Sequence, residues 1–333
     1  MKTEHKYPYN WTLKDAVFTK DKGTVFSCFA CGGGSTMGYK LAGFDVIGCN
    51  EIDRKMIEVY KLNHNPKFSF LESITTFAKR KDLPKELYNL DILDGSPPCS
   101  SFSMAGNREK DWGKEKVFRE GQAEQVLDTL FFDFIDLAKE LQPKVVVAEN
   151  VKGLLMGEAK AYVRKIYKEF DKAGYYCQHF LLDASKMGVP QRRERVFFIC
   201  LRKDLAKPFL YQHDMFTVNP KIKLIFKEPE IAIKEFAKGI QKKETQNYTV
   251  KRFGDVMLDI NRASNTIATD INRYWLDQNN LIDKDTLSLI GSYPIDYNHL
   301  DFNNPQYLIG MSVPPVMTAQ IANQIYEQWI SKL

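Results

Sequence analysis

The residues best suited to chemistry lie close to short apolar runs, and they are Cys99, Glu149, Arg193 and Arg195. A cysteine thiolate is a strong nucleophile, and a carboxyl group can give or take a proton. Guanidinium groups bind oxygen atoms in a forked geometry and favour a nearby thiolate. Together these residue types suit a covalent addition that is assisted by an acid.

The turn that carries Cys99 has little conformational freedom. Pro97 and Pro98 each fix φ near −65° and favour extended geometry in the residue before them. The turn follows an expected strand at residues 90–93, and the carboxyl end of a strand is where open α/β sheets place ligands and catalytic groups. The alternative is an ordinary buried cysteine after a Pro-Pro turn.

Glu149 and the arginines also follow or precede strongly apolar segments. Glu149 comes directly after the β-prone residues 144–148, where an unpaired buried charge would be expensive. It either caps the next element or pairs with an arginine, or it acts as an acid facing the same crevice as Cys99. Arg193 and Arg195 precede the apolar residues 196–199, and their alternative is a solvated charge run.

A glycine-rich turn lies near the start of the chain. A strand from residue 24 leads through Gly32, Gly33 and Gly34 into a helix over 35–42, whose free N–H groups suit a carboxylate-bearing ligand. A second strand, 45–50, ends at Glu51, where an acidic side chain would accept hydrogen bonds from a ribose. The spacing is not G-x-G-x-x-G, which counts against a nicotinamide cofactor. The Cys28–Cys31 pair has the spacing of a zinc or redox site, but the second cysteine pair that such a site would need is missing.

Strands and helices alternate along the chain, which indicates an α/β fold. Helices are expected at 123–141, 159–173 and 316–330, and strands at 144–148, 176–182 and 196–199. We expect three parts: a catalytic and cofactor-binding domain at 1–200, a small irregular domain at 201–300, and a C-terminal segment at 301–333 that returns to the first.

Composition limits the class of protein. The 333 residues are 44% hydrophobic and 27% charged, with no apolar run long enough to span a membrane and no apolar signal peptide. We therefore expect a cytoplasmic protein with no membrane partner, and reduced thiols for its six cysteines. The net charge of +5 permits a polyanionic partner.

Two polar regions could touch such a partner. Residues 104–122 have glycines and cations but no apolar periodicity, which suits a loop that closes over a substrate, or else a solvated excursion. Residues 202–259 hold twelve basic and eight acidic residues with aromatics between them, which suits a polyanion-binding domain or an irregular insertion.

The order of these stretches resembles a DNA (cytosine-5) methyltransferase of the bacterial or phage type. The likeness covers about residues 24–330, and its motifs are Phe29-Ala-Cys-Gly-Gly-Gly34, Asn50-Glu51, Gly95-Ser-Pro-Pro-Cys99, Glu149-Asn150-Val151, Gln191-Arg-Arg-Glu-Arg195 and Gly310-Met-Ser-Val-Pro-Pro315. The resemblance implies a Rossmann-like, S-adenosylmethionine-dependent methyltransferase fold, which is a mixed, mostly parallel sheet with helices on both faces. It also implies a small irregular target-recognition domain.

The resemblance also implies roles for individual residues. The catalytic set would be Cys99, Glu149, Arg193 and Arg195. S-adenosylmethionine, which leaves as S-adenosylhomocysteine, would be held by Phe29, Gly32, Gly33, Gly34, Glu51, Ile52, Ser73, Pro97, Ser312 and Val313. Double-stranded DNA would contact Ser101, Ser103, Arg108, Lys251 and Arg252. A monomer is expected, with a cognate restriction endonuclease as a functional partner.

The implied reaction joins the Cys99 sulfur to C6 of a flipped-out cytosine, so that C5 can attack an activated methyl group. Glu149 would share a proton with N3, and Arg193 and Arg195 would hold the carbonyl O2.

The sequence departs from the family pattern at Cys31 (usually glycine), Ser100 (usually glutamine), Met311 (usually asparagine), near Ser73, where an aspartate is missing, and at Ile52, where an aromatic residue is common. These departures concern cofactor affinity more than chemistry. Two alternatives therefore stay open: an RNA (transfer-RNA) cytosine-5 methyltransferase, and a DNA-binding module of the same fold with weakened catalysis.

Overall fold

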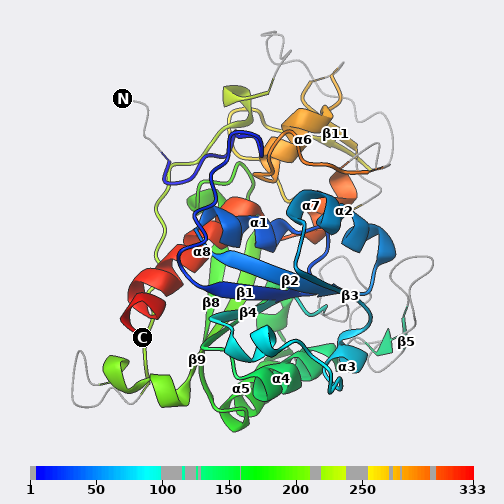
Figure 1. Ribbon diagram of the computed structural model, residues 1–333. Coiled ribbons are helices and arrows are strands. Elements are labelled where there is room, and N and C mark those ends of the chain that lie inside the picture. The colour runs from blue at the N-terminus through cyan, green and yellow to red at the C-terminus, as the bar shows by residue number, and fades with distance from the viewer. Residues whose placement is uncertain are drawn as a thin grey trace.

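The computed structural model describes residues 5–98, 115–116, 125–126, 129–157, 159–210, 219–237, 254–269, 273–277, 280–300 and 305–333, with the backbone alone at 115–116 and 125–126. Its centre is a seven-stranded sheet of order β3-β2-β1-β4-β7-β9-β8 (Figure 1). The strands of this sheet are β1 (Thr24–Cys28), β2 (Asp45–Glu51), β3 (Phe68–Leu71), β4 (Ile92–Gly95), β7 (Val145–Val151), β8 (Tyr175–Asp183) and β9 (Glu194–Arg202).

The helices are α1 (Gly34–Leu41), α2 (Arg54–His64), α3 (Ile74–Phe77), α4 (Leu130–Leu141), α5 (Ala159–Lys172), α6 (Lys284–Ile290), α7 (Gln306–Met311) and α8 (Pro315–Gln328). Short 3₁₀ turns occur at Lys85–Asn89, Lys152–Leu155, Ala184–Lys186, Lys203–Leu205, Lys207–Phe209, Ile233–Glu235 and Ile330–Lys332. Two small sheets pair β5 (Glu115–Lys116) with β6 (Gln125–Val126), and β10 (Asp255–Met257) with β11 (Arg273–Trp275). Among the helices that the structure describes, none combines the length and the apolar character needed to cross a membrane.

The direction of the strands creates one natural binding crevice. Strands β3, β2, β1, β4 and β7 are parallel, whereas β9 is antiparallel to both β7 and β8. The chain builds β2 and β3 on one side of β1 and then crosses to β4 on the other side. Ligands bind in α/β sheets at such a reversal, outside the carboxyl ends of the two central strands. Here that place lies between the ends of β1 and β4.

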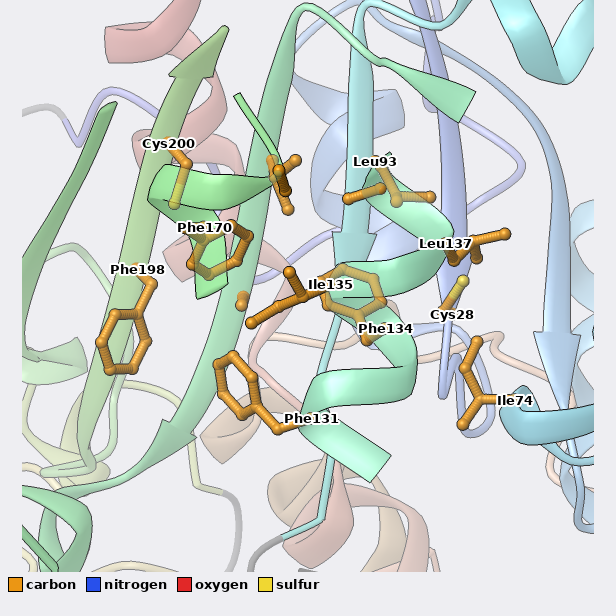
Figure 2. Close-up of a cluster of buried hydrophobic side chains, with 14 of the residues drawn as sticks. Cys28, Ile74, Leu93, Phe131, Phe134, Ile135, Leu137, Phe170, Phe198 and Cys200 are labelled. Atoms are coloured by element: carbon orange, nitrogen blue, oxygen red, sulfur yellow. The ribbon is translucent and has the colours of Figure 1, made fainter. Parts of the chain in front are cut away.

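Alternating residues of the strands form two hydrophobic cores, one on each face of the sheet. Phe26, Leu93 and Val146 of β7 pack with residues of α4 and α5. Figure 2 shows Leu93 with Phe131 and Phe134 of α4 and Phe170 of α5. Val25 and Ile92, which precede Phe26 and Leu93 in the sequence, face α1 and α8 on the other side. Each such buried side chain stabilises the fold by about 1.5–3 kcal/mol. The expected mostly parallel sheet, covered by helices on both faces, is therefore confirmed.

Helix α8 brings the end of the chain back to the glycine-rich helix α1. Its first residue is Pro315, a position that proline favours because its missing N–H needs no partner there. The two helices pack closely, since a β-carbon on Gly38 would lie 2.5 Å from the β-carbon of Thr318. The expected return of the C-terminal helix to the first domain is therefore seen.

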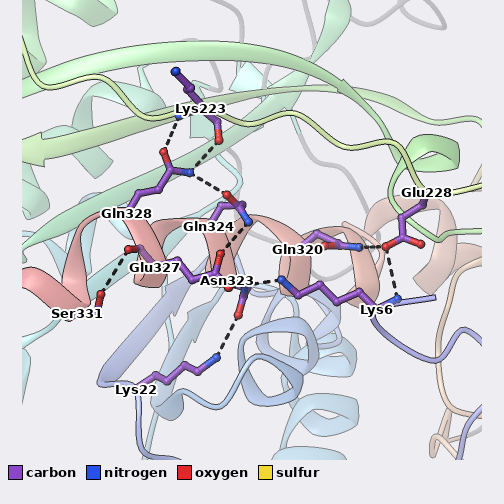
Figure 3. A network of polar contacts seen from close by, with 10 residues as sticks. All are labelled: Lys6, Lys22, Lys223, Glu228, Gln320, Asn323, Gln324, Glu327, Gln328 and Ser331. Atoms are coloured by element: carbon purple, nitrogen blue, oxygen red, sulfur yellow. Dashed lines mark hydrogen bonds and ion pairs between the residues drawn. The ribbon is translucent and has the colours of Figure 1, made fainter. Parts of the chain in front are cut away.

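The polar side of α8 fixes segments from both ends of the chain (Figure 3). Gln320 donates to the Glu228 carboxylate over 2.9 Å, and the Lys6 backbone N–H donates to the same carboxylate. Lys22 donates to the Asn323 side chain over 3.1 Å. These contacts explain why residues 5–23, which show no periodic pattern, are nevertheless ordered along the body of the protein.

Two expectations about local structure need correction. The helix expected at 123–141 begins only at Leu130, because the backbone of Gln125–Val126 pairs with Glu115–Lys116 as an antiparallel ladder. The same pairing places a short strand inside the loop expected at 104–122, most of which lies outside the described residues. The boundaries expected for the three domains stay predictions.

Candidate active site

The turn between β1 and α1 is strained. Phe29 and Cys31 have left-handed backbone conformations, with φ of 51° and 49°, and Gly33 has φ of 95°. A residue other than glycine pays about 1–3 kcal/mol to stay in this region, and such strain gathers at functional sites. The strain therefore marks the end of β1 as the part of the sheet where the backbone is shaped for a ligand. It also explains why glycine would be usual at position 31.

This strain leads to a prediction about stability. Cys31→Gly should be more stable than Cys31→Ala by about 1 kcal/mol, because only glycine relieves the left-handed conformation. Urea unfolding of both variants measures the difference. The matched control is Ala30→Gly, where φ is not left-handed and glycine should instead destabilise by about 0.5–1 kcal/mol. Equal stability of the two Cys31 variants would contradict the strain at this position.

Glu51 ties the glycine-rich turn to the end of β2. Its carboxylate accepts hydrogen bonds from the backbone N–H groups of Cys31 (2.7 Å), Ile52 (2.8 Å) and Asp53 (2.9 Å). Burial raises the pKa of Glu51, while these N–H groups oppose the shift. Glu51 thus lies at the carboxyl end of β2 as expected, with an acceptor-only group at the edge of the crevice. The expected neighbour Ile52 lies there too, half-buried.

The residues expected around the cofactor converge on the start of α1. A β-carbon on Gly34 would lie 2.5 Å from the Val313 carbonyl oxygen and 2.9 Å from the β-carbon of Ser312. Gly32 and Gly33 are likewise closely covered, Gly32 by Leu308 and Gly33 by the His64 ring. The structure therefore brings the glycine turn and the residues after α7 together, although almost 280 residues separate them in the sequence.

The strand before the Pro-Pro-Cys turn is held from both sides. Asp94 in β4 accepts hydrogen bonds from the Ser27 hydroxyl in β1 (2.8 Å) and the Tyr39 hydroxyl in α1 (3.1 Å). The Asn150 side chain in β7 donates to the Pro97 carbonyl over 3.0 Å. The turn is thus fixed between the ends of β1 and β7 up to Pro98. Cys99 itself lies outside the described residues.

Asp94 makes the stability of the fold depend on pH. Desolvation raises its pKa from 3.8 to about 7, although Ser27 and Tyr39 oppose the shift, and the Glu149 charge adds to it. At a pH between these two pKa values, the Asp94 carboxyl group holds a proton in the folded state and has lost it in the unfolded state. The free energy of unfolding therefore falls as the pH rises from about 4 to 7.

Asp94→Asn should remove that pH dependence. We expect the variant to gain about 2 kcal/mol relative to the unmodified protein between pH 5 and pH 8. Urea unfolding at the two pH values measures this gain, and the surface variant Asp171→Asn serves as control. An equal pH response of the Asp94→Asn variant and the unmodified protein would show that Asp94 is ionised in the fold without cost.

Glu149 pairs with Arg195 at the neighbouring strand ends. The Arg195 Nε atom lies 3.0 Å from Glu149 Oε1, and the side chains are only 16% and 12% exposed. Burial lowers the pKa of Arg195, and the Glu149 charge offsets part of this shift. The pairing with an arginine that the sequence offered as one alternative is therefore present. Glu149 can still act as an acid that faces Cys99, because its neighbour Asn150 binds the Pro97 carbonyl in the turn that leads to Cys99.

Arg193 is the most deeply buried cation of the site. Its Nη2 atom donates to the Gly310 carbonyl over 2.7 Å, and the residue is 2% exposed. Burial and the neighbouring Arg195 charge lower its pKa to about 9. Arg193 and Arg195 therefore lie in the same crevice but have different described partners: Gly310 in α7 for the first and Glu149 for the second.

The remaining expected residues divide into three groups. Phe29 is half-buried and packs against Phe134 at a ring distance of 6.4 Å. The Ser73 hydroxyl caps α3 by accepting from the Thr76 N–H over 3.2 Å, so its described contact is structural. The expected DNA contacts lie outside the described residues, as Cys99 does: Ser101, Ser103, Arg108, Lys251 and Arg252.

Sequence reasoning missed several residues that shape this site. Tyr297 donates its hydroxyl proton to the Gly32 carbonyl and lies 2.9 Å from the His64 Nε2 atom. Asp94 and Tyr39 were also missed. The local sequence carries no signal for Tyr297, because its partners lie more than 230 residues away. A signal did exist for Asp94, which is a charged residue directly after the apolar Ile92-Leu93 pair.

Comparison with known proteins places this geometry in context. The family model for C-5 cytosine-specific DNA methylase matches residues 23–299. Type II methyltransferase M.NgoPII of Neisseria gonorrhoeae is 34% identical over 204 residues, which cover 61% of this chain and 55% of that protein. Type II methyltransferase M.FnuDI of Fusobacterium nucleatum is 37% identical over 181 residues, or 54% and 47% of the two chains. The chain thus spans about half the length of the curated relatives it matches.

Solved structures with the same fold cover nearly the whole chain. An E. coli prophage protein described as a DNA modification methyltransferase superposes with a TM-score of 0.61 at 19% identity, covering 92% of this chain and 99% of that one. A Spodoptera frugiperda DNMT2 mutant gives a TM-score of 0.60 at 17% identity, with 91% and 99% covered. At this level of identity the likeness concerns the fold, which is that of Rossmann-like methyltransferases.

Proposed function

Because the chain belongs to the C-5 cytosine-specific DNA methylase family, we propose that it transfers a methyl group from S-adenosylmethionine to C5 of cytosine in double-stranded DNA. The observation that carries the proposal is the Glu149–Arg195 pair, 3.0 Å apart. Asn150, the residue next to Glu149, holds the Pro97 carbonyl two residues before Cys99. An acid, a fork of N–H donors and a nucleophile-bearing turn therefore meet at adjacent strand ends.

Cysteine addition solves the main chemical problem of this reaction. Cytosine C5 is a weak nucleophile, but a Cys99 thiolate that forms a bond to C6 converts the ring to an enamine. C5 then attacks the methyl group, which the bound donor supplies as an electrophile. Loss of the C5 proton and elimination of the thiolate restore the aromatic ring. The other residues of the site must neutralise the charge that builds on the ring during this addition.

Glu149 and Arg195 are suited to that balance. A carboxyl group that shares its proton with N3 neutralises charge as it builds on the ring. Arg195, bound to Glu149, can orient that carboxyl group and donate to O2 of the base. Arg193, which binds the Gly310 carbonyl, reaches toward the cofactor side. The target base has to leave the DNA stack first, at a cost of a few kcal/mol.

The described residues at the end of β1 fit an adenosyl cofactor. Glu51 provides the acceptor for a ribose, and α1 provides free N–H groups at its start. Ser312 and Val313 lie against Gly34 and would close the pocket. Two positions would give the cofactor fewer polar contacts than the family pattern provides. The Ser73 hydroxyl caps α3, and Met311, which is 43% exposed, has no polar side-chain group.

Other parts of the proposal follow from the sequence. We propose that Ser101, Ser103, Arg108, Lys251 and Arg252 contact DNA. The protein would act as a cytoplasmic monomer in a prokaryotic cell or a phage-infected host. A restriction endonuclease that cuts the same DNA site would be its functional partner, and S-adenosylhomocysteine its second product.

Incorporation of tritiated methyl groups tests the proposed function. The protein is incubated with tritiated S-adenosylmethionine and either duplex DNA or transfer RNA. We expect label in DNA cytosine and none in RNA. Label only in transfer RNA would favour an RNA methyltransferase, and no label in either nucleic acid would favour a DNA-binding module.

A further inference from the structure

The Arg193 side chain is a buried cation whose hydrogen-bonding capacity is mostly unused. Nη2 binds the Gly310 carbonyl, but Nε and Nη1 are buried and have no hydrogen-bond partner in the part of the chain that the structure describes. Buried donors are almost always satisfied, and an uncompensated buried charge costs several kcal/mol. An acceptor outside the described residues is therefore expected beside these two nitrogens.

Arg193 lies between the two halves of the site. Arg195, two residues further along, belongs to the pair with Glu149. Gly310, bound by Arg193, begins the segment whose Ser312 and Val313 lie against Gly34 at the start of α1. The Glu149 charge also acts on Arg193 and offsets part of the effect of burial on its pKa. The bond to Gly310 places the Arg193 side chain at the boundary with the side of the crevice where the cofactor is expected.

Other groups at this junction favour an anion. The Tyr293 hydroxyl is buried next to Gly34, and its described partner is the Ser312 hydroxyl, which gives its own proton to the Leu308 carbonyl over 2.7 Å. The start of α1 adds the positive end of a helix dipole. The unused groups of Arg193 are donors on a cation, so the partner that suits them is an acceptor with negative charge.

The described carboxylates of the crevice are already engaged. Glu149 binds Arg195, Glu51 accepts from three backbone N–H groups, and Asp94 accepts from two hydroxyls. Because these described carboxylates already have partners, we look to a ligand for the anion. Cytosine is neutral and would offer only its O2 atom, whereas the methyl donor carries a carboxylate at its amino-acid end.

We propose that Arg193 binds the carboxylate of the methyl donor through an unused N–H group, while Nη2 holds the Gly310 carbonyl. This inference rests on the proposed function, because it takes the donor to be S-adenosylmethionine. A charge-assisted hydrogen bond between a guanidinium group and a carboxylate is among the strongest hydrogen bonds in proteins. Arg193 would then be a cofactor-binding residue, and base recognition would fall to Arg195 and Glu149.

Calorimetric titration with two ligands tests the proposal. S-adenosylmethionine and its decarboxylated analogue share the adenosine, the sulfonium and the amino group, and differ in the carboxylate. We expect the unmodified protein to bind the decarboxylated compound about 30-fold more weakly, as loss of a hydrogen bond between charged groups predicts. Arg193→Gln should bind both compounds with nearly equal affinity, and Arg193→Lys should keep part of the difference.

The control is Arg192→Gln, because the neighbouring Arg192 side chain is half-buried and bonds to Asn265 instead. This variant should keep the full 30-fold difference. A thermal melt without ligand shows that each variant is folded, and the comparison of two ligands on the unmodified protein needs no variant.

Several outcomes would overturn the inference. It fails if the unmodified protein binds both compounds equally, or if Arg193→Gln still discriminates between them. It also fails if Arg193→Gln weakens DNA binding alone, which would assign Arg193 to the base. In these cases the proposed function stands. If the unmodified protein binds neither compound, the proposed function and this inference fail together.

Discussion

Replacing Cys99 with serine is expected to lower methyl transfer at least about 10⁴-fold while leaving DNA and cofactor binding nearly unchanged. A serine hydroxyl is far less nucleophilic than a thiolate, so the bond to C6 cannot form at a useful rate. Loss of a catalytic nucleophile typically removes most of the catalysis, since the other groups act only after it. Single-turnover methylation of duplex DNA measures the rate, and gel-shift titration measures DNA binding.

The matched control for this variant is Cys177→Ser. Cys177 lies in β8 at the edge of the sheet, half-buried and distant in topology from the crevice. The Cys177→Ser variant should methylate DNA at the same rate as the unmodified protein. If the Cys99→Ser variant retained more than a hundredth of the activity, addition of sulfur to the base could not be the route of the reaction.

Replacing Glu149 with glutamine is expected to lower the methylation rate about 10²- to 10³-fold. The amide can still donate a hydrogen bond to N3, but it cannot share a proton, so the charge on the ring is less well neutralised. The variant also leaves Arg195 buried without its ion-pair partner, 3.0 Å away in the unmodified protein. We therefore expect a loss of stability of about 1–3 kcal/mol as well.

Measurements of rate and stability separate these two effects. Single-turnover rates are taken at a temperature where urea unfolding shows the variant to be fully folded. Glu169→Gln, which removes a partly exposed carboxylate paired with Lys172 on α5, is the control and should leave both quantities nearly unchanged. A Glu149→Gln variant with the unmodified rate would remove Glu149 from the catalytic set and leave it as a structural partner of Arg195.

The sequence was sufficient to predict the sheet and the strand ends at which several expected site residues lie. The continuous β-prone run at residues 144–148 predicted a strand, and the glycines at 32–34 predicted a turn into a helix, and both elements are found there. Glu51 and Glu149 follow apolar strands directly, so their place at a strand end could be inferred. The family resemblance then connected these separate strand ends into one site, which the family match and the fold support.

Contacts between distant segments could not be predicted in the same way. The link from Arg193 to the Gly310 carbonyl joins residues 117 positions apart, and no periodic pattern encodes it. The Tyr297–Gly32 contact and the Asn150–Pro97 bond are of the same kind. The start of α4 was placed too early because residues 123–129 are apolar enough to continue a helical pattern, whereas part of that stretch pairs as a strand.

Bisulfite sequencing of plasmid DNA from bacteria that express the chain tests the central claim most directly. The account predicts that cytosines within one recurring short sequence become resistant to conversion, and that the same sites convert fully when the Cys99→Ser variant is expressed instead. Complete conversion of every cytosine in DNA from cells with the unmodified, folded protein would contradict it.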